Sequence, residues 1–597
     1  MKSTLLSALR EPHLSNAATS SSIEVLESRI APSIFIVTSL ADSGAGTLRA
    51  ALALADSHPG PDTIIFHLPA PPVHSENIIT LTSGSLTSQG DVTIKGPGAG
   101  KLIIDGGGNY SGFVILNKTT NTDQPVTISG LSVEHGKSSP YGYGGGIYST
   151  ESLTLKNVTI SGNTAPTAGG VWVNGNSGRG GATKLSISNS LITGNSATGN
   201  GGGGVNFYGL DSFSMTGSVV TGNTGATTGG GIYGHLKTTG AGMTITKSLV
   251  SGNTAGYGGG LWLADNNVMA ASKITISATK ITGNVSNSIG HEQGGGGLFI
   301  GGGNAVVTGS TIENNTSVYY GGGLQALAFT SLTISGSTIS GNRTTTAQPS
   351  TPYQGGGGIF VDGSGSAPAL NVTIKGSHIT DNQTAYSGGG VYAIKGIALT
   401  ISSSTISGNE AISDDGGGIC AYGHGANAVN LSVTGSTLSG NIAKWGGAIY
   451  AGDGNLIGTG GAFSITASKI TGNSCINGGG GLYVNGSSSA TVKNTTVAGN
   501  NAGLYGGGMN IAFVTGFHVS GGSFVGNSAG TNGGGIYVGQ VAPGSILGVT
   551  ISGNTAVAAG GGVYDANSSV TLQVAKVTGN SAPTGPDISG AGTFTYV

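Results

Sequence analysis

Two adjacent carboxylates and a nearby histidine are the residues of this sequence whose types and spacing best suit catalysis. Asp414 and Asp415 are consecutive, and His424 follows in the same segment between two glycines. A pair of carboxyl groups can act as acid and base on a glycosidic bond when one is protonated and the other is ionised. Asp414, Asp415 and His424 are therefore the candidate catalytic residues, and polysaccharide cleavage is the chemistry they would perform.

The same segment, from Ser413 to Gly425, resembles the paired aspartates and the Gly-His-Gly of polygalacturonases. It departs from that pattern because no Arg-x-Lys follows, and because Asp415 and His424 are too close in sequence to lie one coil apart, as they do in that family. The glycine-rich flanks are enough to produce a Gly-His-Gly by chance. We therefore expect this segment to be non-catalytic.

Metal and cofactor sites have little support in the sequence. The ten histidines show no metal-ligand spacing, and no Gly-Gly-x-Gly-x-Asp calcium repeat is present. A calcium-dependent lyase would need several acidic residues together on one wall, whereas the 24 acidic residues are spread over 597 positions. Runs such as Gly294–Gly297 are not phosphate-binding loops, because neither a Lys-Ser/Thr nor a helix follows them. We expect no cofactor and no bound metal.

A repeated unit must position any site in this chain, because it runs from Gly144 to Asn580 with little else between its copies. Its cleanest copy is Val549–Ala556 followed by Gly560–Tyr564. The asparagines that mark the unit are 26 to 40 residues apart, a period typical of repeat architectures. They are Asn163, Asn195, Asn223, Asn253, Asn284, Asn315, Asn342, Asn382, Asn409, Asn441, Asn473, Asn500, Asn527, Asn554 and Asn580.

Short strands and tight turns make up each copy. Leu332–Ser335 and Leu399–Ser402 alternate apolar and polar residues, a pattern typical of a strand with one buried face. The glycine runs that follow each Asn disfavour a helix, where glycine is costly, and favour turns. Coils of such strands, stacked at about 4.8 Å, form a parallel β-helix, an all-β solenoid with a continuous core. We therefore predict one long body.

The recurring Asn is predicted to have a structural role. It follows a buried β-branched residue by three positions, as Asn163 follows Ile160, so it occupies the same turn of every coil. Identical amides stacked one above another can form a hydrogen-bonded ladder. Tolerance of left-handed dihedrals is a second reason to expect Asn there.

An apolar pair usually follows the glycines, as in Ile147–Tyr148 and Leu261–Trp262. Neighbouring residues of a strand point to opposite faces. We therefore expect one member of each pair to point inward, while the aromatic residues form a vertical stack on the other side of the wall.

Two short motifs link the repeats to a known family. Gly446–Ile449 reads Gly-Gly-Ala-Ile and Phe524–Asn527 reads Phe-Val-Gly-Asn, and in tandem they resemble the repeats of the chlamydial polymorphic outer membrane proteins. In other copies Ile, Val or Leu replaces the Phe, and Gly replaces the Ala. Such motifs recur in pectin-lyase-like surface β-helices. The resemblance implies a single-stranded right-handed parallel β-helix at a cell surface.

Residues 34–75 change character and are predicted to close the N-terminal end of the solenoid. Ile34–Val37 and Thr63–Phe66 read as strands, and Thr47–Ala55 is rich in the helix formers Ala, Leu and Arg. A helix laid across the first coil would stop its exposed edge from recruiting other strands. We therefore expect an N-terminal helical cap.

Arg49 is the charged residue of this cap with a candidate role. It ends an Asp-Ser-Gly-Ala-Gly-Thr-Leu-Arg phrase that starts at Asp42 and resembles the N-terminal cap of bacterial surface β-helix proteins. We expect Arg49 to form a salt bridge with Asp42 or Asp62. Catalysis by Arg49 is the alternative.

The whole chain is predicted to divide into five parts. Residues 1–33 form a flexible leader or export segment, in which Leu26–Arg29 resembles the Leu-Glu-x-Arg motif near the N-termini of planctomycete surface proteins. The cap is followed by irregular first coils over 76–143, regular repeats over 144–582 and an end strand over 583–597. Within the last part, the strand is expected at Thr593–Val597.

Charge and cysteine content exclude several classes of partner. The net charge is −2 and there is no basic run, so neither nucleic acid nor an anionic membrane surface is expected to bind. No segment has 18 consecutive apolar residues, so no transmembrane helix is expected. Cys420 and Cys475 occupy different phases of the repeat, and the sequence leaves a disulfide between them open.

The outward face of the strands indicates a function. Alternation places Thr333, Ser335, Thr400 and Ser402 outside, in uncharged rows suited to weak multivalent contact with glycans or other surface proteins. Ice binding would need a strict Thr-x-Thr in every coil, which is absent. We predict a non-enzymatic extracellular or cell-surface protein, at the bacterial outer membrane or beyond, that serves as an adhesin, stalk or matrix component. The alternative is a polysaccharide-binding or polysaccharide-degrading enzyme, a lyase or glycosidase. Self-association through end strands or side walls is open in both cases.

Overall fold

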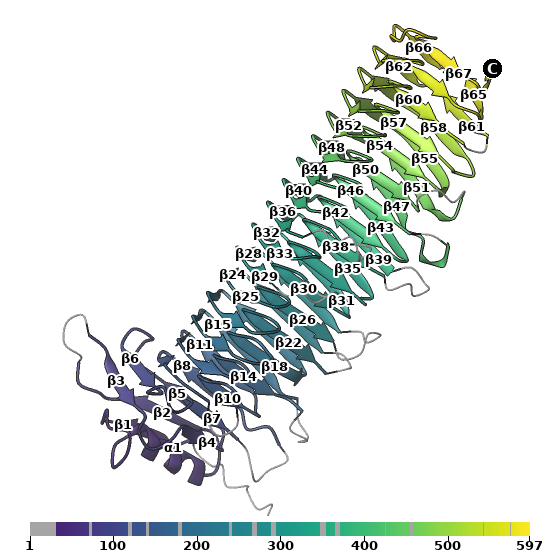
Figure 1. The fold of residues 1–597 in the computed structure, drawn as a ribbon. Helices are drawn as coiled ribbons and strands as arrows, with labels where there is room; N and C mark the ends of the chain where they lie inside the picture. The colour runs from purple at the N-terminus through teal and green to yellow at the C-terminus, as the bar shows by residue number, and fades with distance from the viewer. Residues whose placement is uncertain are drawn as a thin grey trace, which may run out of the picture.

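One elongated solenoid makes up the described part of the chain. The computed structural model describes residues 32–70, 75–116, 122–138, 142–176, 182–237, 241–265, 272–287, 294–346, 354–363, 370–423, 425–453, 458–540, 543–573 and 575–596. They form a right-handed parallel β-helix of about 18 turns, which confirms the predicted fold class. The coils stack in chain order from the purple N-terminal end to the yellow C-terminal end (Figure 1).

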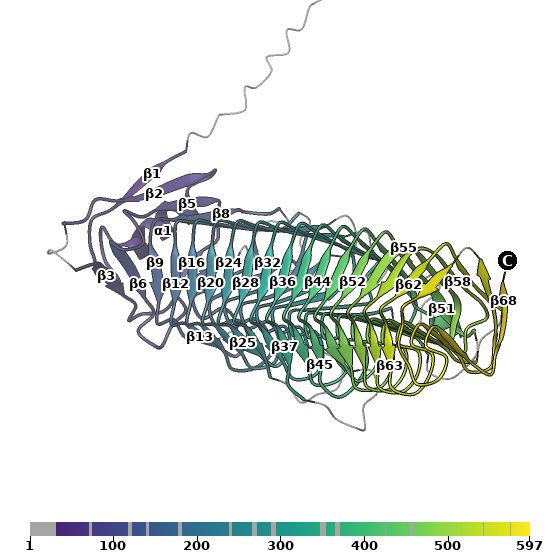
Figure 2. The same ribbon diagram turned by 90° about the horizontal axis from the view of Figure 1, so that it is seen from above.

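Each regular coil has four short strands. In one coil they are β15 (Lys184–Ser188), β16 (Leu191–Thr193), β17 (Ser196–Ala197) and β18 (Val205–Leu210). We call the four stacks of equivalent strands walls 1 to 4, in that order. Strands pair in parallel with their equivalents in the next coil, as β15 does with β19 (Ser212–Thr216). Figure 2 shows walls 2 and 3 running along the rod.

Alternating burial produces a single core inside the coils. Along β15 the side chains of Leu185 and Ile187 point inward and are 1% exposed, while Ser186 between them is only partly buried. Inward side chains of the walls join in one hydrophobic cluster that extends from Val37 to Leu572. Full burial of an aliphatic side chain contributes roughly 1.5–3 kcal/mol. The core therefore holds successive coils together, as the alternation predicts.

Glycine triplets lie in the turn that leads into wall 4, and two physical needs explain them. Gly229 has a φ of 58°, in the left-handed region that favours glycine. Gly230 and Gly231 lie outside that region, but a Cβ on them would lie 2.3 and 2.6 Å from the carbonyl oxygens of Gly259 and Gly260 in the next coil. Any larger residue would push the coils apart.

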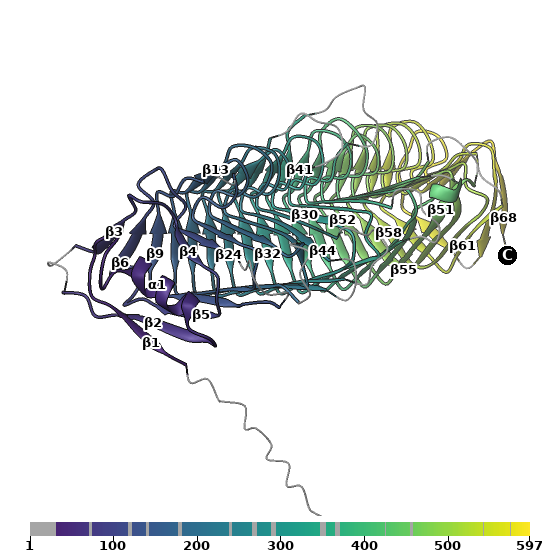
Figure 3. The same ribbon diagram turned by 90° about the horizontal axis from the view of Figure 1, so that it is seen from below.

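The N-terminal cap contains the predicted elements. β1 (Ile34–Val37) pairs in parallel with β2 (Asp62–Phe66), and α1 (Leu48–Ser57) lies between them in sequence. The Thr47 hydroxyl accepts a hydrogen bond from the backbone N–H of Ala50 at 3.2 Å, which fixes the start of the helix. The helix covers the end of the first coils (Figure 3), where it packs against β1, β2 and β4 (Leu86–Ser88) and buries Leu48, Ala51, Leu52 and Ala55.

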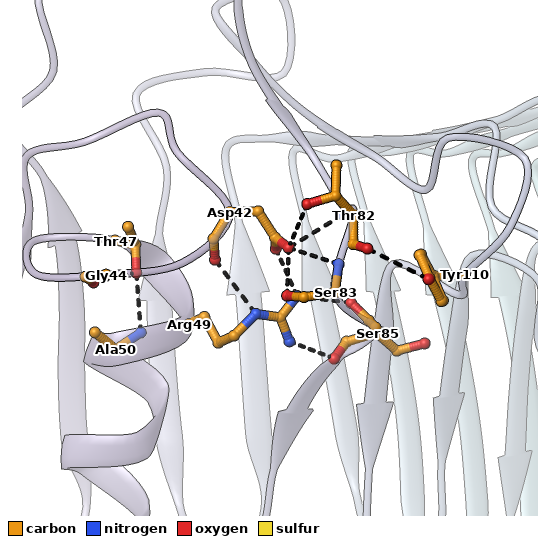
Figure 4. A network of polar contacts seen from close by, with 10 residues as sticks. Asp42, Gly44, Thr47, Arg49, Ala50, Thr82, Ser83, Ser85 and Tyr110 are labelled. Atoms are coloured by element: carbon orange, nitrogen blue, oxygen red, sulfur yellow. Dashed lines mark hydrogen bonds and ion pairs between the residues drawn. The ribbon is translucent and has the colours of Figure 1, made fainter.

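Arg49 forms the salt bridge predicted for it, and the partner is Asp42 rather than Asp62. Its Nη2 lies 2.5 Å from Asp42 Oδ1, and its guanidinium also donates to two backbone carbonyls of residues 84–85 (Figure 4). Burial raises the pKa of Asp42, but hydrogen bonds from Ser83 and Arg49 outweigh burial and hold that pKa well below its ordinary value. The pair fastens the segment before α1 to the first coils.

The far end of the described rod finishes with β68 (Thr593–Tyr596), which pairs in parallel with β65 (Ser569–Gln573). The strand expected at Thr593–Val597 is therefore present through Tyr596. The division into five parts stays a prediction. Residues 1–31, including Leu26–Arg29, lie outside the described residues.

Candidate functional site

The recurring asparagines form one continuous column of hydrogen bonds in the turn between walls 2 and 3. Each Nδ2 donates to the Oδ1 of the Asn in the next coil at 2.8 to 3.0 Å, from Asn163 to Asn580. The Oδ1 also accepts a backbone N–H, as Asn409 Oδ1 does from Asn382 at 3.0 Å. The column ends where Asn580 donates to Asp587 Oδ1 at 2.9 Å. The predicted asparagine ladder is therefore present.

The ladder amides are buried and paired with one another, which indicates a structural role. Asn409 is 0% exposed, and the largest exposure in the column is the 9% of Asn580. The Nδ2 of Asn409 donates both to Asn441 and to the backbone carbonyl of Ile379, at 3.0 and 2.9 Å. An external ligand would have to separate two coils to reach these amides.

One reason for expecting Asn in this turn was wrong. All fifteen ladder asparagines lie in the described residues and none has a left-handed φ, whereas the residue before each of them does. That residue is usually glycine, such as Gly194 with a φ of 61°, and it is Asn314 or Asp381 in two coils. The preceding position therefore makes the turn, and the ladder alone accounts for the Asn.

A second buried polar column was missed at the corner between walls 1 and 2. In eleven coils the residue five positions before the ladder Asn is Ser or Thr, and its hydroxyl oxygen accepts the backbone N–H of the equivalent residue in the preceding coil at 3.1 to 3.4 Å. The constant spacing from the Asn was the signal that could have found it. The residues are Ser190, Ser218, Ser248, Thr279, Ser310, Ser337, Ser377, Ser404, Ser436, Ser468 and Thr495.

The two candidate catalytic aspartates lie in the turn before wall 4, ahead of β46 (Ile419–Tyr422). Asp414 Oδ2 accepts a hydrogen bond from Ser387 Oγ at 2.8 Å. Asp415 Oδ1 is buried and has no hydrogen-bond partner. The structure describes the two carboxyls of the predicted set, whereas His424 lies outside the described residues.

Burial raises the pKa of both carboxyls. For Asp415 the neighbouring Asp414 raises the pKa further, while Lys444 opposes the rise. For Asp414 burial outweighs the lowering effects of the Ser387 hydrogen bond and of Lys444. An acid–base pair needs two pKa values that are pushed apart. Here both pKa values are raised, that of Asp415 further than that of Asp414, so burial favours the protonated form of each carboxyl.

Aromatic side chains form the predicted stack on the outer side of wall 4. The ring centroids of Tyr233 and Trp262 are 4.7 Å apart, and those of Trp262 and Phe299 are 5.1 Å apart with an interplanar angle of 7°. The preceding residue of the strand points inward, as Leu261 does at 0% exposure. The Nε1 atoms of Trp172 and Trp262 are buried and have no hydrogen-bond partner within the described part of the chain.

The two cysteines are buried and unpaired, so the disulfide left open by the sequence does not form. Burial raises the pKa of the Cys420 thiol well above its ordinary value and that of Cys475 to about 12. Neither is therefore a reactive thiolate at neutral pH.

The described ranges contain neither a cluster of metal-binding side chains nor a helix able to span a membrane. No three His, Cys, Asp or Glu side chains in them are placed to hold a metal ion. No helix among these residues has both the length and the apolar character that crossing a membrane requires.

Two family models match parts of the chain. Residues 244–438 match the model described as right handed beta helix region. The chain contains a right-handed β-helix region. Residues 435–452 match the Chlamydia polymorphic membrane protein repeat, and they include the Gly446–Ile449 motif on which the resemblance rested. A search of the curated proteins found no match.

Two solved structures of low identity are similar to the chain. Pectate lyase Pel9A is 14% identical with a TM-score of 0.31, and the match covers 58% of this chain and 77% of that one. PfbA, a surface adhesin of Streptococcus pneumoniae, is 11% identical with a TM-score of 0.14, and the match covers 92% and 87%. Likenesses of this size say nothing about what the chain does.

Proposed function

We propose that the chain is a non-enzymatic protein of the cell surface or extracellular matrix, in which the rod serves as a stalk, an adhesin or a matrix component. The observation that carries the proposal is the uninterrupted asparagine ladder, because a column of buried, paired amides stiffens a rod and offers no reactive group. About 18 turns at about 4.8 Å each give a rod of roughly 90 Å. Such a rod can hold a binding surface away from its point of attachment.

The outer faces of the walls suit partners that make many weak contacts at once. Only 8% of residues are charged, and rows of hydroxyls lie in register on wall 1, as in Ser186 and Ser214, whose Oγ atoms are 3.2 Å apart. Regular uncharged rows suit multivalent contact with glycans or other surface proteins. Side walls and end strands also offer routes to self-association.

The proposal is tested by labelling intact cells of the source organism with an antibody raised against the purified rod. Labelling of unpermeabilised cells that is lost after brief external protease treatment supports a surface location. Labelling that needs permeabilisation would overturn it. In parallel, the purified protein is incubated with a panel of polysaccharides and the products are assayed for new reducing ends and unsaturated sugars. No release is expected.

The alternative function is a polysaccharide-binding or polysaccharide-degrading enzyme, a lyase or glycosidase. The position of Asp414 and Asp415 beside the aromatic stack of wall 4 favours it, because aromatic surfaces with a few polar groups are typical of ligand sites. If the panel reveals cleavage, the Asp414→Asn and Asp415→Asn variants decide its origin. A loss of more than tenfold would support catalysis by the pair, and unchanged cleavage would exclude it.

A further inference from the structure

A serine, a histidine and an aspartate meet in the N-terminal cap, away from the ladder and from wall 4. Ser33 directly precedes β1, His58 directly follows α1, and Asp62 is the first residue of β2. The three come together because β1 pairs in parallel with β2 and α1 packs against both strands. These residue types are those of a nucleophile, a base and an acid.

The distances match those of a serine activated by a histidine. Ser33 Oγ lies 3.1 Å from His58 Nε2, and His58 Nδ1 lies 3.0 Å from Asp62 Oδ1. A hydroxyl within about 2.6–3.2 Å of a base that a third group orients is the arrangement used in acyl transfer. The imidazole is not aligned for a full hydrogen bond at Nδ1, which is common in a site at rest.

Backbone and ring contacts hold the nucleophile and the base in place. The carbonyl of Ser33 accepts a hydrogen bond from the N–H of Thr63 at 2.9 Å. The N–H of His58 donates to the carbonyl of Leu54 at 3.1 Å, which ends α1. The ring of Phe35 meets the imidazole edge-on, with centroids 6.3 Å apart. The serine and the histidine therefore keep their relative position.

Solvent reaches the serine and the histidine but not the carboxylate. The side chain of His58 is 33% exposed, whereas that of Asp62 is 0% exposed. Ser33 is partly exposed. Water can therefore enter the site, while the carboxylate acts from a buried position, where a charge has a stronger effect than in water.

The peptide bond between Pro32 and Ser33 is the group that this site can act on. The nitrogen of that bond is the Ser33 N–H, which donates to Asp62 Oδ1 at 2.9 Å. The other oxygen, Asp62 Oδ2, is buried and has no hydrogen-bond partner among the described residues. A neutral amide offers this carboxylate one N–H. A free ammonium group on Ser33 would offer three N–H groups and a positive charge.

The surroundings of Asp62 also favour a positive charge at this nitrogen. Burial, and then the negative charges of Asp123 and Asp62, raise the pKa of Asp91. The three carboxyl groups therefore repel one another. An ammonium group on Ser33 would offset that repulsion, so the local field stabilises the amine that cleavage of the peptide bond creates.

From these contacts we propose that Ser33 cleaves the peptide bond that precedes it, so that the chain releases residues 1–32 by its own chemistry. His58 Nε2 takes the hydroxyl proton while Ser33 Oγ attacks the carbonyl carbon of Pro32. The C–N bond then breaks, the proton passes to the Ser33 nitrogen, and Pro32 is left as an ester on Oγ. Water, deprotonated by His58, hydrolyses the ester to a Pro32 carboxylate and restores the hydroxyl. The new ammonium group of Ser33 pairs with Asp62.

This reaction occurs once in each chain and acts on no external substrate, so it goes beyond the rod proposed above without depending on it. The sequence predicts a leader or export segment over residues 1–33, and cleavage before Ser33 would separate the rod from nearly all of it. Cell-surface labelling tests the rod and N-terminal analysis tests the cleavage, so the two proposals can fail independently.

The full chain, synthesised in a reconstituted translation system free of proteases, tests the proposal. Mass spectrometry follows the intact mass and the N-terminal peptide during incubation at neutral pH. We expect a product that begins at Ser33, formed at a first-order rate that does not depend on protein concentration. Chains that keep residues 1–32 for several days, although they show a cooperative unfolding transition, would overturn the proposal.

Hydroxylamine tests for the ester. It attacks esters much faster than amides, so it should accelerate release and leave Pro32 as a hydroxamate, which the mass of the released peptide identifies. Release at an unchanged rate, with an ordinary carboxylate on Pro32, would contradict an ester on Ser33.

Variants assign the nucleophile and the base. Ser33→Ala should abolish cleavage, whereas Ser33→Cys, which keeps a nucleophile, should retain it. His58→Gln should slow cleavage at least about 100-fold, the usual contribution of a general acid–base. His67→Gln is the matched control, because His67 is an exposed histidine next to the other end of β2, and its rate should equal that of the wild type. Cleavage of Ser33→Ala at the wild-type rate would refute the mechanism.

Asp62→Asn separates the charge of the carboxylate from its hydrogen bond. The amide oxygen of the variant can still accept the Ser33 N–H, but it carries no charge for the departing amine. We expect cleavage to slow at least about tenfold, while the unfolding midpoint shows that the cap remains folded. An unchanged rate would exclude the proposed pairing of the ammonium group with Asp62.

Discussion

Two regions of the rod differ in whether their buried polar groups are paired: the turn between walls 2 and 3, and wall 4 with the turn before it. In the turn between walls 2 and 3, the ladder amides are paired from coil to coil, as in Asn382, Asn409 and Asn441. On wall 4 and its turn, Asn510 Oδ1 and Asp415 Oδ1 are buried with no partner. An unpaired buried polar group costs about 1–3 kcal/mol. The ladder therefore stabilises the architecture, whereas these two oxygens of wall 4 and its turn add no such pairing.

Breaking the ladder should have the largest effect. Asn409→Ala removes the acceptor of both the N–H and the Nδ2 of Asn382, and it leaves the carbonyl of Ile379 and the Oδ1 of Asn441 without that donor. We expect the free energy of unfolding to fall by about 3–6 kcal/mol. Urea unfolding followed by tryptophan fluorescence measures the change.

Asn510→Ala is the matched control for that experiment, since Asn510 is also buried, with 4% exposed against 0% for Asn409, but its Oδ1 has no partner. Its loss should cost less than about 1 kcal/mol, because it removes an unpaired group. If the two variants lost the same stability, the contrast between the two edges would not hold.

The second prediction concerns the pH dependence of wall 4. Burial raises the folded pKa of Asp415 above the ordinary value of about 3.9. The folded state therefore holds this proton more tightly, and stability is highest below the ordinary value and falls as pH rises through it towards the folded pKa. Asp415→Asn should reduce that fall, because only Asp414 then keeps a raised pKa, and the variant should be more stable than the wild type at about pH 7. Unfolding curves of both proteins at several pH values measure this difference. An equal fall of stability with pH in the wild type and the variant would contradict the prediction.

The contribution of the N-terminal cap to stability should depend on pH in the opposite direction. The folded pKa of Asp42 is lowered, so its stabilisation is present above the ordinary value of about 3.9 and is lost as pH falls through the folded pKa. Asp42→Asn should lose about 1–3 kcal/mol at neutral pH, the value of charged hydrogen bonds, and less in strong acid. Thermal unfolding across the same pH range checks this, and a loss that does not depend on pH would count against it.

The smallest effect is expected in the hydroxyl column between walls 1 and 2. Ser404→Ala removes one acceptor of the Ser377 backbone N–H, at 3.2 Å, and one donor to the carbonyl of Ser402, at 2.8 Å. We expect a loss of about 1–2 kcal/mol, below that of Asn409→Ala in the same assay. A larger loss than for Asn409 would reverse the ranking of the two columns.

The repeat period predicts those features that depend on side chains one period apart. The ladder and the aromatic stack of wall 4 are of this kind, and the hydroxyl column could have been found from its constant spacing to the Asn. The pKa values of Asp414 and Asp415 could not be predicted from the repeat period. They depend on burial and on Lys444, which a neighbouring coil brings close. The left-handed φ was predicted at the ladder Asn, but the residue before the Asn has it. Gly and Asn are adjacent in this turn and both tolerate that dihedral, so the sequence alone does not distinguish them.

A groove at the corner between walls 1 and 2, near the N-terminal end of the rod, could not be predicted from the repeat at all. One of its sides is the loop Gly96–Ala99, which belongs to the irregular first coils. Its aliphatic residues Leu191 and Val219 do not mark it in the sequence, because Leu249, next in the same column, is also aliphatic and does not line the groove. A loop outside the periodic pattern has no fixed position in the stack until the coils are in place.

Hydrogen exchange of the ladder backbone amides, followed by mass spectrometry, tests the central claim most directly. Each of these N–H groups is bonded to the amide of the next coil, as that of Asn409 is to Asn441 Oδ1 at 3.1 Å. We predict slow exchange along the whole column in the wild type, and faster exchange in the coils on both sides of position 409 in Asn409→Ala. Fast exchange in scattered coils of the wild type, with no spread of the effect from position 409, would contradict a single hydrogen-bonded column.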